Sequence, residues 1–191
     1  EEEKKYENFS KSIRRRAATI GGHNMDDYPL KMHVFNRARL IKNSKNRIPY
    51  GVDLIQKYRR ESWIVFTENK KQAKEFNKII NTKGFKSALY NTDLDSGERL
   101  ENLNKFKKAD LNVLVTCTAL DEGFDMPEAD GALILSASSS KRQRVQRMGR
   151  VLRITENKPN ALIVTVYSSK TEFDKLMEEA KRYHKEGVPV S

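Results

Sequence analysis

From residue 63 onward the chain alternates short apolar runs with amphipathic segments, and this alternation restricts its possible folds more than any other feature. The apolar runs have the composition and length of β-strands: residues 63–67, 87–90, 112–116, 131–135 and 161–166. The segments between them place apolar side chains at helical spacing, as Leu100, Leu103 and Phe106 do within residues 96–108. The pattern predicts an open, mainly parallel α/β sheet flanked by helices, with ligands at the carboxyl ends of its strands.

Residues 1–60 have a different pattern, which predicts helices and no strand. Apolar side chains recur at helical spacing in residues 3–18 and again in residues 34–41, with a glycine pair between the two segments, and a third short helix is expected near residues 51–60. We therefore expect residues 1–60 to form a helical extension or interdomain linker, and residues 61–191 to form the sheet domain. The last helix is expected to start at a capping-box pattern, Thr171-Glu-Phe-Asp174.

Residues 141–153 carry six basic side chains and no acidic one. On a helix, Val145, Met148 and Leu152 would form one apolar stripe, and the arginines and glutamines would cover an arc of roughly 120° opposite to it. Planar, permanently charged guanidinium groups on such a helix suit phosphate oxygens. The alternative is a solvated surface helix, but surface helices usually mix both signs of charge. The run therefore favours phosphate binding.

Composition points in the same direction. Lysine and arginine outnumber aspartate and glutamate by 37 to 26, and the resulting net charge of +11 favours a polyanionic partner, with nucleic acid ahead of a membrane surface. The sequence has no apolar stretch long enough to span a bilayer and starts with acidic residues, so we expect a soluble intracellular chain. Its single cysteine, Cys117, is expected to be a buried thiol, and the three histidines offer no zinc-binding spacing.

Three segments resemble motifs of superfamily 2 helicases and translocases. Gln146-Arg-Met-Gly-Arg-Val-Leu-Arg153 is similar to motif VI, Thr116-Cys-Thr-Ala-Leu-Asp-Glu-Gly-Phe-Asp-Met-Pro127 to motif V, and Trp63-Ile-Val-Phe-Thr67 to the motif IV strand. They occur in the family's order and cover about residues 60–168. The resemblance implies the second, C-terminal RecA-like domain of such an enzyme. It is greater to the branch of the repair helicase XPB and restriction-system motors than to DEAD-box RNA helicases.

The resemblance also implies roles for individual residues of motif VI. Arg150 and Arg153 match arginines that reach the triphosphate held on the first domain, where they would stabilise charge in the transition state. Gln146 matches a glutamine near the attacking water. Arg147 is expected to contribute to the nucleotide site, and a salt bridge to acidic residues of motif V is its alternative role.

In motif V, the resemblance implies that Asp125 accepts a hydrogen bond from the ATP ribose and that Gly123 permits the necessary turn. Hydroxyl and guanidinium groups can position a nucleic-acid backbone without selecting its sequence. The resemblance implies such contacts from Thr67, Arg99, Thr116 and Thr118, although ordinary β-propensity would also explain the threonines.

The sequence contains neither a G-x-x-x-x-G-K-[ST] loop nor a D-E-x-H or D-E-x-D box. The resemblance implies that ATP and Mg²⁺ bind mainly to an N-terminal RecA-like domain of the same protein, or of a separate polypeptide. We therefore expect one lobe of an ATP-dependent motor, inactive alone, with DNA favoured over RNA as partner. The alternatives are a non-catalytic, basic nucleic-acid-binding module and a lobe of an RNA helicase.

Overall fold

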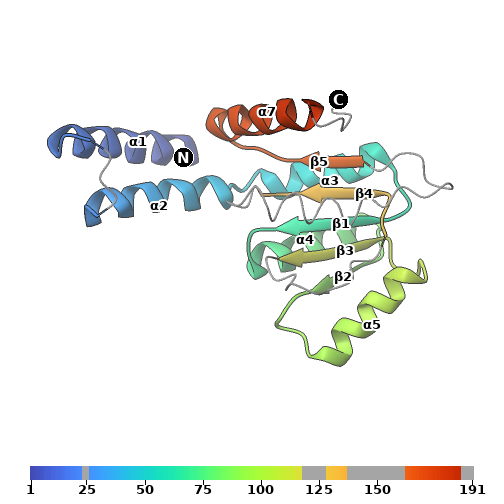
Figure 1. Cartoon of the computed structure of the whole chain (residues 1–191). Helices are drawn as coiled ribbons and strands as arrows, with labels where there is room; N and C mark the ends of the chain where they lie inside the picture. The colour runs from blue at the N-terminus through green and yellow to red at the C-terminus, as the bar shows by residue number, and fades with distance from the viewer. Residues whose placement is uncertain (23–25, 118–127, 137–161, 186–191) are drawn as a thin grey trace. The chain divides into compact units, whose positions relative to one another are not determined.

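The computed structural model describes residues 1–22, 26–117, 128–136 and 162–185 (Figure 1). The chain divides into two compact units. The sheet unit comprises Lys45–Tyr167, and the helical unit comprises Glu1–Ser44 together with Ser168–Ser191.

The sheet unit contains five parallel strands in the order β2-β3-β1-β4-β5 (Figure 1). The strand bounds are β1 (Trp63–Thr67), β2 (Ser87–Tyr90), β3 (Val113–Cys117), β4 (Gly131–Ile134) and β5 (Leu162–Thr165). This confirms the predicted α/β sheet, with strand ends that differ from the expected ones by a single residue where they differ. Every residue of β1 and β3 is buried, which explains their uninterrupted apolar sequences.

Side chains of β1 alternate between two hydrophobic cores, one on each face of the sheet. Trp63 and Val65 pack in a core with α3 (Arg47–Tyr58) and α4 (Lys70–Thr82). Ile64 and Phe66 pack in a second core with α5 (Ser96–Lys107). Helices therefore cover both faces, as expected when parallel strands are joined by crossover helices.

The expected apolar face of α5 is only partly correct. Leu103 and Phe106 are buried, but Leu100 is 58% exposed. Asn102 contributes instead, because its Nδ2 atom donates a hydrogen bond to the carbonyl oxygen of Leu89 in β2, at 3.0 Å. The helix thus contacts the sheet through its second half, and the pattern of apolar residues could not show this.

Helix α3 belongs to the sheet unit, and its first residue holds two strands together. The side chain of Arg47 is buried, and its Nη1 atom donates hydrogen bonds of 2.7 Å to the carbonyl oxygens of Leu135 and Val166. These carbonyls directly follow β4 and β5, where the ladder between the two strands ends. The division into compact units falls after Ser44, so it assigns α3 to the sheet unit.

We expect Arg47→Ala to lower the free energy of unfolding of the sheet unit by about 3 kcal/mol, because charge-assisted hydrogen bonds to two buried carbonyls are lost. The free energy of unfolding of Arg47→Lys should lie between those of the parent and Arg47→Ala, since an ammonium group lacks the rigid fork of a guanidinium. Urea titrations followed by fluorescence of Trp63, the single tryptophan, measure the change within this unit. The control is Arg60→Ala at an exposed position. Equal midpoints for Arg47→Ala and Arg60→Ala would contradict the role of Arg47.

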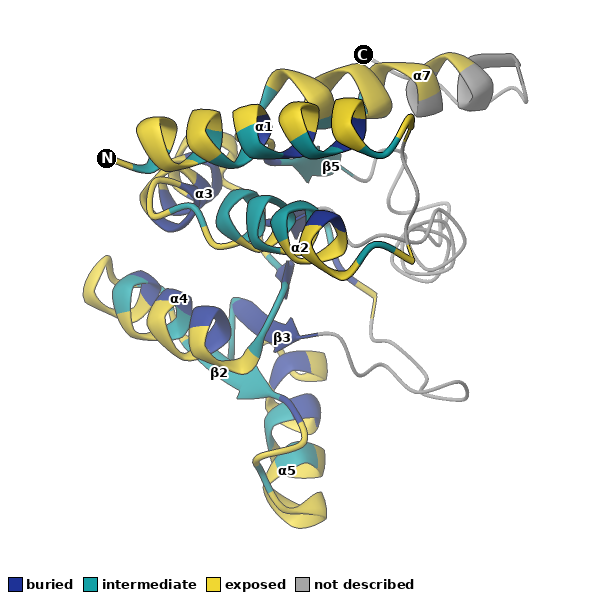
Figure 2. Cartoon of the chain, turned by 90° about the vertical axis from the view of Figure 1, so that its left-hand side faces the viewer, coloured by how far each residue is buried: buried dark blue, intermediate teal, exposed yellow. Residues whose placement is uncertain are grey.

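The helical unit contains α1 (Glu2–Thr19), α2 (Tyr28–Lys42) and α7 (Lys170–Lys185), so the predicted N-terminal helical extension is present. Helices α1 and α2 lie side by side, with Ile13, Ala17 and Leu30 buried (Figure 2). Asp27 begins α2 as its N-cap, because its Oδ1 atom accepts a hydrogen bond from the N–H of Leu30 at 2.9 Å.

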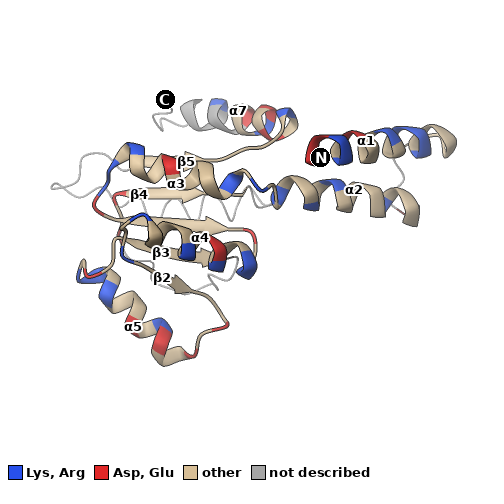
Figure 3. Cartoon of the chain, turned by 180° about the vertical axis from the view of Figure 1, so that it is seen from behind, with Lys and Arg blue, Asp and Glu red and all other residues tan. Residues whose placement is uncertain are grey.

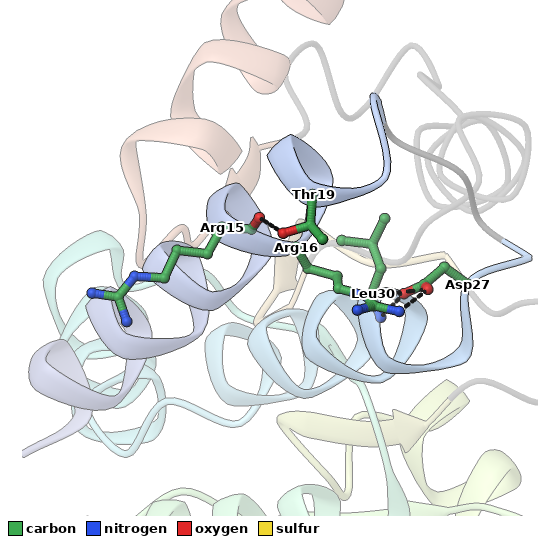
Figure 4. A network of polar contacts seen from close by, with 5 residues as sticks. All are labelled: Arg15, Arg16, Thr19, Asp27 and Leu30. Carbon is green, nitrogen blue, oxygen red and sulfur yellow. Dashed lines mark hydrogen bonds and ion pairs between the residues drawn. The ribbon is translucent and has the colours of Figure 1, made fainter.

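Asp27 also links α2 to α1. The guanidinium of Arg16 donates to the Asp27 carboxylate from Nε at 3.0 Å and from Nη2 at 2.6 Å (Figure 4). The pKa of Asp27 therefore lies below its ordinary value, mainly because of the Arg16 hydrogen bonds and further because of the Leu30 N–H. The guanidinium of Arg16 is thus engaged in an ion pair within the helical unit.

The expected start of α7 at Thr171 is wrong. The helix begins at Lys170, and the side chain of Ser169 accepts a hydrogen bond from the N–H of Glu172 at 3.2 Å. The Glu172 carboxylate in turn accepts from the N–H of Ser168 at 2.8 Å. Two overlapping [ST]-x-x-[DE] patterns occur here, and hydrogen bonding selects the earlier one.

Candidate functional site

Buried polar side chains gather at the carboxyl edge of the sheet. Within the described residues, four polar side chains that are at most 3% exposed lie within two residues of the carboxyl ends of neighbouring strands: Thr67, Asn91, Thr116 and Ser136. The strands are parallel and in register, with Phe66 opposite both Thr116 and Ile134 and with Tyr90 opposite Thr116, so these strand ends lie at one edge. Buried polar groups require hydrogen-bond partners, so this edge is the candidate site.

Thr67 and Thr116 are the two predicted contact residues that the structure brings together. The Oγ1 atom of Thr67 donates to the carbonyl oxygen of Thr116 at 3.0 Å and lies 3.3 Å from the carbonyl oxygen of Asn69. The hydroxyl proton of Thr67 is thereby engaged within the sheet. The hydroxyl of Thr116, in contrast, is buried and has no hydrogen-bond partner among the described residues.

Asn91 was not predicted, and it supplies a second buried donor at the same edge. Its Oδ1 atom accepts a hydrogen bond from the N–H of Asp93 at 2.9 Å, which shapes the loop after β2. Its Nδ2 atom is buried and makes no hydrogen bond to any part of the chain that the structure describes. The only signal in the sequence is that a polar residue directly follows the apolar run 87–90.

Two lysines of α4 hold this loop. Nζ of Lys74 lies 2.8 Å from Oδ2 of Asp93, and Lys70 forms a second ion pair with the same carboxylate. The pKa of Asp93 lies below its ordinary value because of the hydrogen bonds from Lys70 and then from Lys74. Asp95, two residues later, accepts a hydrogen bond from the N–H of Glu98 at 2.8 Å and caps α5.

The start of α5 places Arg99 close in sequence to this loop. Its side chain is half-buried, and its backbone N–H donates to the carbonyl oxygen of Asp95 at 3.1 Å. Among the described residues, its guanidinium forms no ion pair and no hydrogen bond with Thr67 or Thr116. The structure therefore does not bring Arg99 together with these two threonines.

The remaining predicted site residues lie outside the described residues, and their roles stay predictions: Thr118, Gly123, Asp125, Gln146, Arg147, Arg150 and Arg153. The structure does show where the two segments that contain them begin. β3 ends at Cys117, whose thiol is buried as expected, and β4 is followed by Ser136, whose Oγ atom donates to Glu68 Oε2 at 3.1 Å. Both segments leave the sheet at its carboxyl edge.

No helix among the described residues is both long and apolar enough to cross a membrane. No group of histidine, cysteine, aspartate and glutamate side chains in those same residues is arranged to hold a metal ion.

A parallel five-stranded sheet, covered by helices on both faces and carrying polar groups at its carboxyl edge, defines a RecA-like domain. Residues 46–155, more than half of the chain, match the family described as helicase conserved C-terminal domain. The chain therefore belongs to this family of superfamily 2 helicase C-terminal domains.

Similarity to individual proteins agrees with this assignment. The chain is 29% identical over 187 residues to the DNA 3'-5' translocase XPB2 of Sulfurisphaera tokodaii, a match that covers 90% of this chain and 41% of that protein. It is 25% identical over 118 residues to the ATP-dependent rRNA helicase RRP3 of Scheffersomyces stipitis, covering 62% of this chain and 24% of that protein. The chain thus spans less than half the length of these relatives.

Among solved structures, the C-terminal domain of the DEAD-box protein Dbp5 has a TM-score of 0.64 at 21% identity, covering 75% of this chain and 81% of that one. This likeness shows that the chain shares the fold of that domain.

The ion pairs of Asp93 generate a prediction about pH. Because its folded-state pKa is depressed, the ionised carboxylate stabilises the fold above the ordinary carboxyl pKa of about 4, and this contribution is lost as pH falls through the lowered value. We expect Asp93→Asn to be less stable than the parent at neutral pH and to approach it in acid. Unfolding titrations across this range provide the measurement. Asp110→Asn, at an exposed position, is the control and should leave the pH dependence of the parent unchanged.

Proposed function

We propose that this chain is the second motor lobe of an ATP-dependent DNA helicase or translocase, similar to the XPB branch. The observation that carries the proposal is the pair of unpartnered donors at the carboxyl edge, Thr116 Oγ1 and Asn91 Nδ2, inside the region that matches the helicase family. DNA is favoured over RNA because the DNA 3'-5' translocase XPB2 matches 90% of this chain, whereas the ATP-dependent RNA helicase DBP3 of Ajellomyces capsulatus matches 83%.

The edge would contact a nucleic-acid backbone through several short donors. Thr116 and Asn91 would supply hydroxyl and amide N–H groups, Thr118 a further hydroxyl, and Arg99 a cation. Thr67, whose proton is engaged by the Thr116 carbonyl, would hold β1 and β3 in the geometry that presents these donors. Contacts of this kind position a strand without selecting its sequence, and the net charge of +11 would make binding strongly dependent on salt.

We expect Thr116→Val to weaken nucleic-acid binding by roughly fivefold, the worth of one hydrogen bond, without lowering stability. The hydroxyl of Thr116 has no described partner, so its removal leaves no protein group unsatisfied. Thr67→Val is the matched control and should lower stability, because it removes the hydrogen bond to Thr116. Fluorescence anisotropy and thermal melting measure the two effects. A destabilised Thr116→Val with unchanged affinity would show that the hydroxyl serves the fold alone.

The ATP chemistry of the proposal requires a second lobe. Arg150, Arg153 and Gln146 would act on a triphosphate that an N-terminal RecA-like domain holds together with Mg²⁺, and Asp125 and Gly123 would border the ribose. Arg147 would contribute to the nucleotide site or pair with an acidic residue of motif V. Without a phosphate-binding loop of its own, the isolated chain should not accelerate ATP hydrolysis.

In the two-lobed protein, we expect Arg150→Ala or Arg153→Ala to lower kcat by about two orders of magnitude or more, since an arginine supplied across a cleft stabilises the charge of the transition state. The melting temperature should stay close to that of the parent. Arg144→Ala, in the same basic run but outside the motif, is the control. Full turnover combined with a clear fall in melting temperature would remove both arginines from the catalytic site.

A lobe of an RNA helicase is the second candidate, because an rRNA helicase is also among the relatives. The two candidates differ in which nucleic acid stimulates ATP hydrolysis by the two-lobed protein. Stimulation by DNA but not by RNA of the same sequence supports the proposal, and the reverse result supports the alternative.

A further inference from the structure

The helical unit contains a cavity that no motif explains. It lies between α1 and α2, has a volume of about 650 Å³ and belongs to a part of the chain outside the family match at residues 46–155. Its lining includes one aromatic, one hydroxyl and four charged side chains: Tyr6, Glu7, Ser10, Lys11, Arg14 and Arg37. Residues 7, 10, 11 and 14 share one face of α1 because they follow helical spacing.

The charge of this cavity is positive. Three cations line it against a single carboxylate, and basic positions recur along α1 and α2 (Figure 3). Neither Lys11 nor Arg14 forms an ion pair or a hydrogen bond with any described residue. Arg16, two residues on from Arg14, differs in this respect because Asp27 engages its guanidinium (Figure 4). The cavity therefore holds positive charge that the described protein does not neutralise.

Arg37 is held at the cavity by an aromatic ring. Its Cζ atom lies 5.8 Å from the centroid of the Tyr6 ring, within the range of a cation–π interaction. The side chain of Arg37 is half-buried, so its guanidinium is partly ordered before a ligand arrives. A preorganised cation loses less conformational freedom on binding an anion.

Ser10 gives the cavity a buried donor. The residue is 8% exposed, and its Oγ atom has no hydrogen-bond partner among the described residues. A buried hydroxyl without a partner is unfavourable, whereas an apolar side chain at this helical position would cost nothing. An oxygen atom of a bound anion would provide the missing partner.

We propose that this cavity binds a phosphate group of a nucleic-acid backbone. Ser10 donates a hydrogen bond to a phosphate oxygen, and Lys11, Arg14 and Arg37 supply the charge that offsets repulsion from Glu7. The volume exceeds that of one phosphate group, which leaves space for atoms attached to it. The inference rests on the proposed nucleic-acid function and adds a contact outside the helicase motifs.

The test compares neighbouring arginines in the complete chain. Both Arg14 and Arg15 are exposed residues of α1, but only Arg14 lines the cavity. With a fluorescein-labelled duplex, we expect Arg14→Ala to weaken binding about tenfold and to reduce the salt slope by about 0.9, which corresponds to one phosphate contact. Arg15→Ala should change both quantities much less. Equal effects of the two substitutions would overturn the proposal, because they would show a response to net charge alone.

Ser10→Ala separates binding from structure. We expect affinity for the duplex to fall by roughly fivefold, the worth of one hydrogen bond, while the melting temperature without nucleic acid stays equal or rises. A merely structural serine would give a lower melting temperature and unchanged affinity, which would overturn the proposal. Thr116→Val in the same assay distinguishes the two sites. A loss with Thr116→Val but none with Ser10→Ala rejects the cavity and leaves the proposed function standing.

Inorganic phosphate identifies the source of the anion. If the cavity takes a backbone phosphate, inorganic phosphate should compete with the duplex for the parent chain and compete much less for Arg14→Ala. If phosphate raises the melting temperature of the parent but not that of Arg14→Ala, and duplex affinity is the same for both, the cavity binds a free anion. That outcome would overturn the nucleic-acid assignment.

Discussion

The hydrogen bonds from Arg47 to the carbonyl oxygens of Leu135 and Val166 join the ends of β4 and β5 at the carboxyl edge of the sheet, where the candidate site lies. A single buried guanidinium closes the ends of β4 and β5, where the strand ladder no longer supplies donors. The same bonds fasten the first turn of α3 to the sheet, so that Ile48, Val52 and Ile55 enter the core with Trp63 and Phe76. The buried, charged side chain of Arg47 therefore stabilises the strand ends at this edge of the sheet.

The edge combines groups that stabilise the sheet with buried donors that have no described hydrogen-bond partner. Thr67 uses its proton to join β1 to β3, and Asp93 secures the loop after β2 through Lys70 and Lys74. Thr116 and Asn91 keep buried donors without described partners, which costs stability and is typical of a site that meets a ligand. The segments containing the family motifs leave the sheet at the same edge, after β3 and β4.

The helical unit repeats this combination in a different architecture. Arg16 and Asp27 form an ion pair that joins α1 to α2. Lys11 and Arg14 of α1 have no described partner and lie near the buried hydroxyl of Ser10. Positive charge in this protein is therefore of two kinds, one engaged in the fold and one available to an anion. A count of basic residues cannot distinguish them.

The sequence by itself determined the five strands and the helices between them, because apolar periodicity reports burial directly. Motif order likewise indicated the helicase C-terminal family. Only the tertiary structure decided which polar groups are satisfied: Arg47 finds its partners 88 and 119 residues away, and Asn91 becomes a buried donor only when β2 joins the sheet. The folded structure also explains why position 131 is a glycine, since a Cβ atom there would lie 2.6 Å from the Trp63 ring. Local pattern encodes where strands and helices form, whereas the burial of a side chain such as Leu100, its hydrogen bonds and its steric fit depend on neighbours that are distant in the chain.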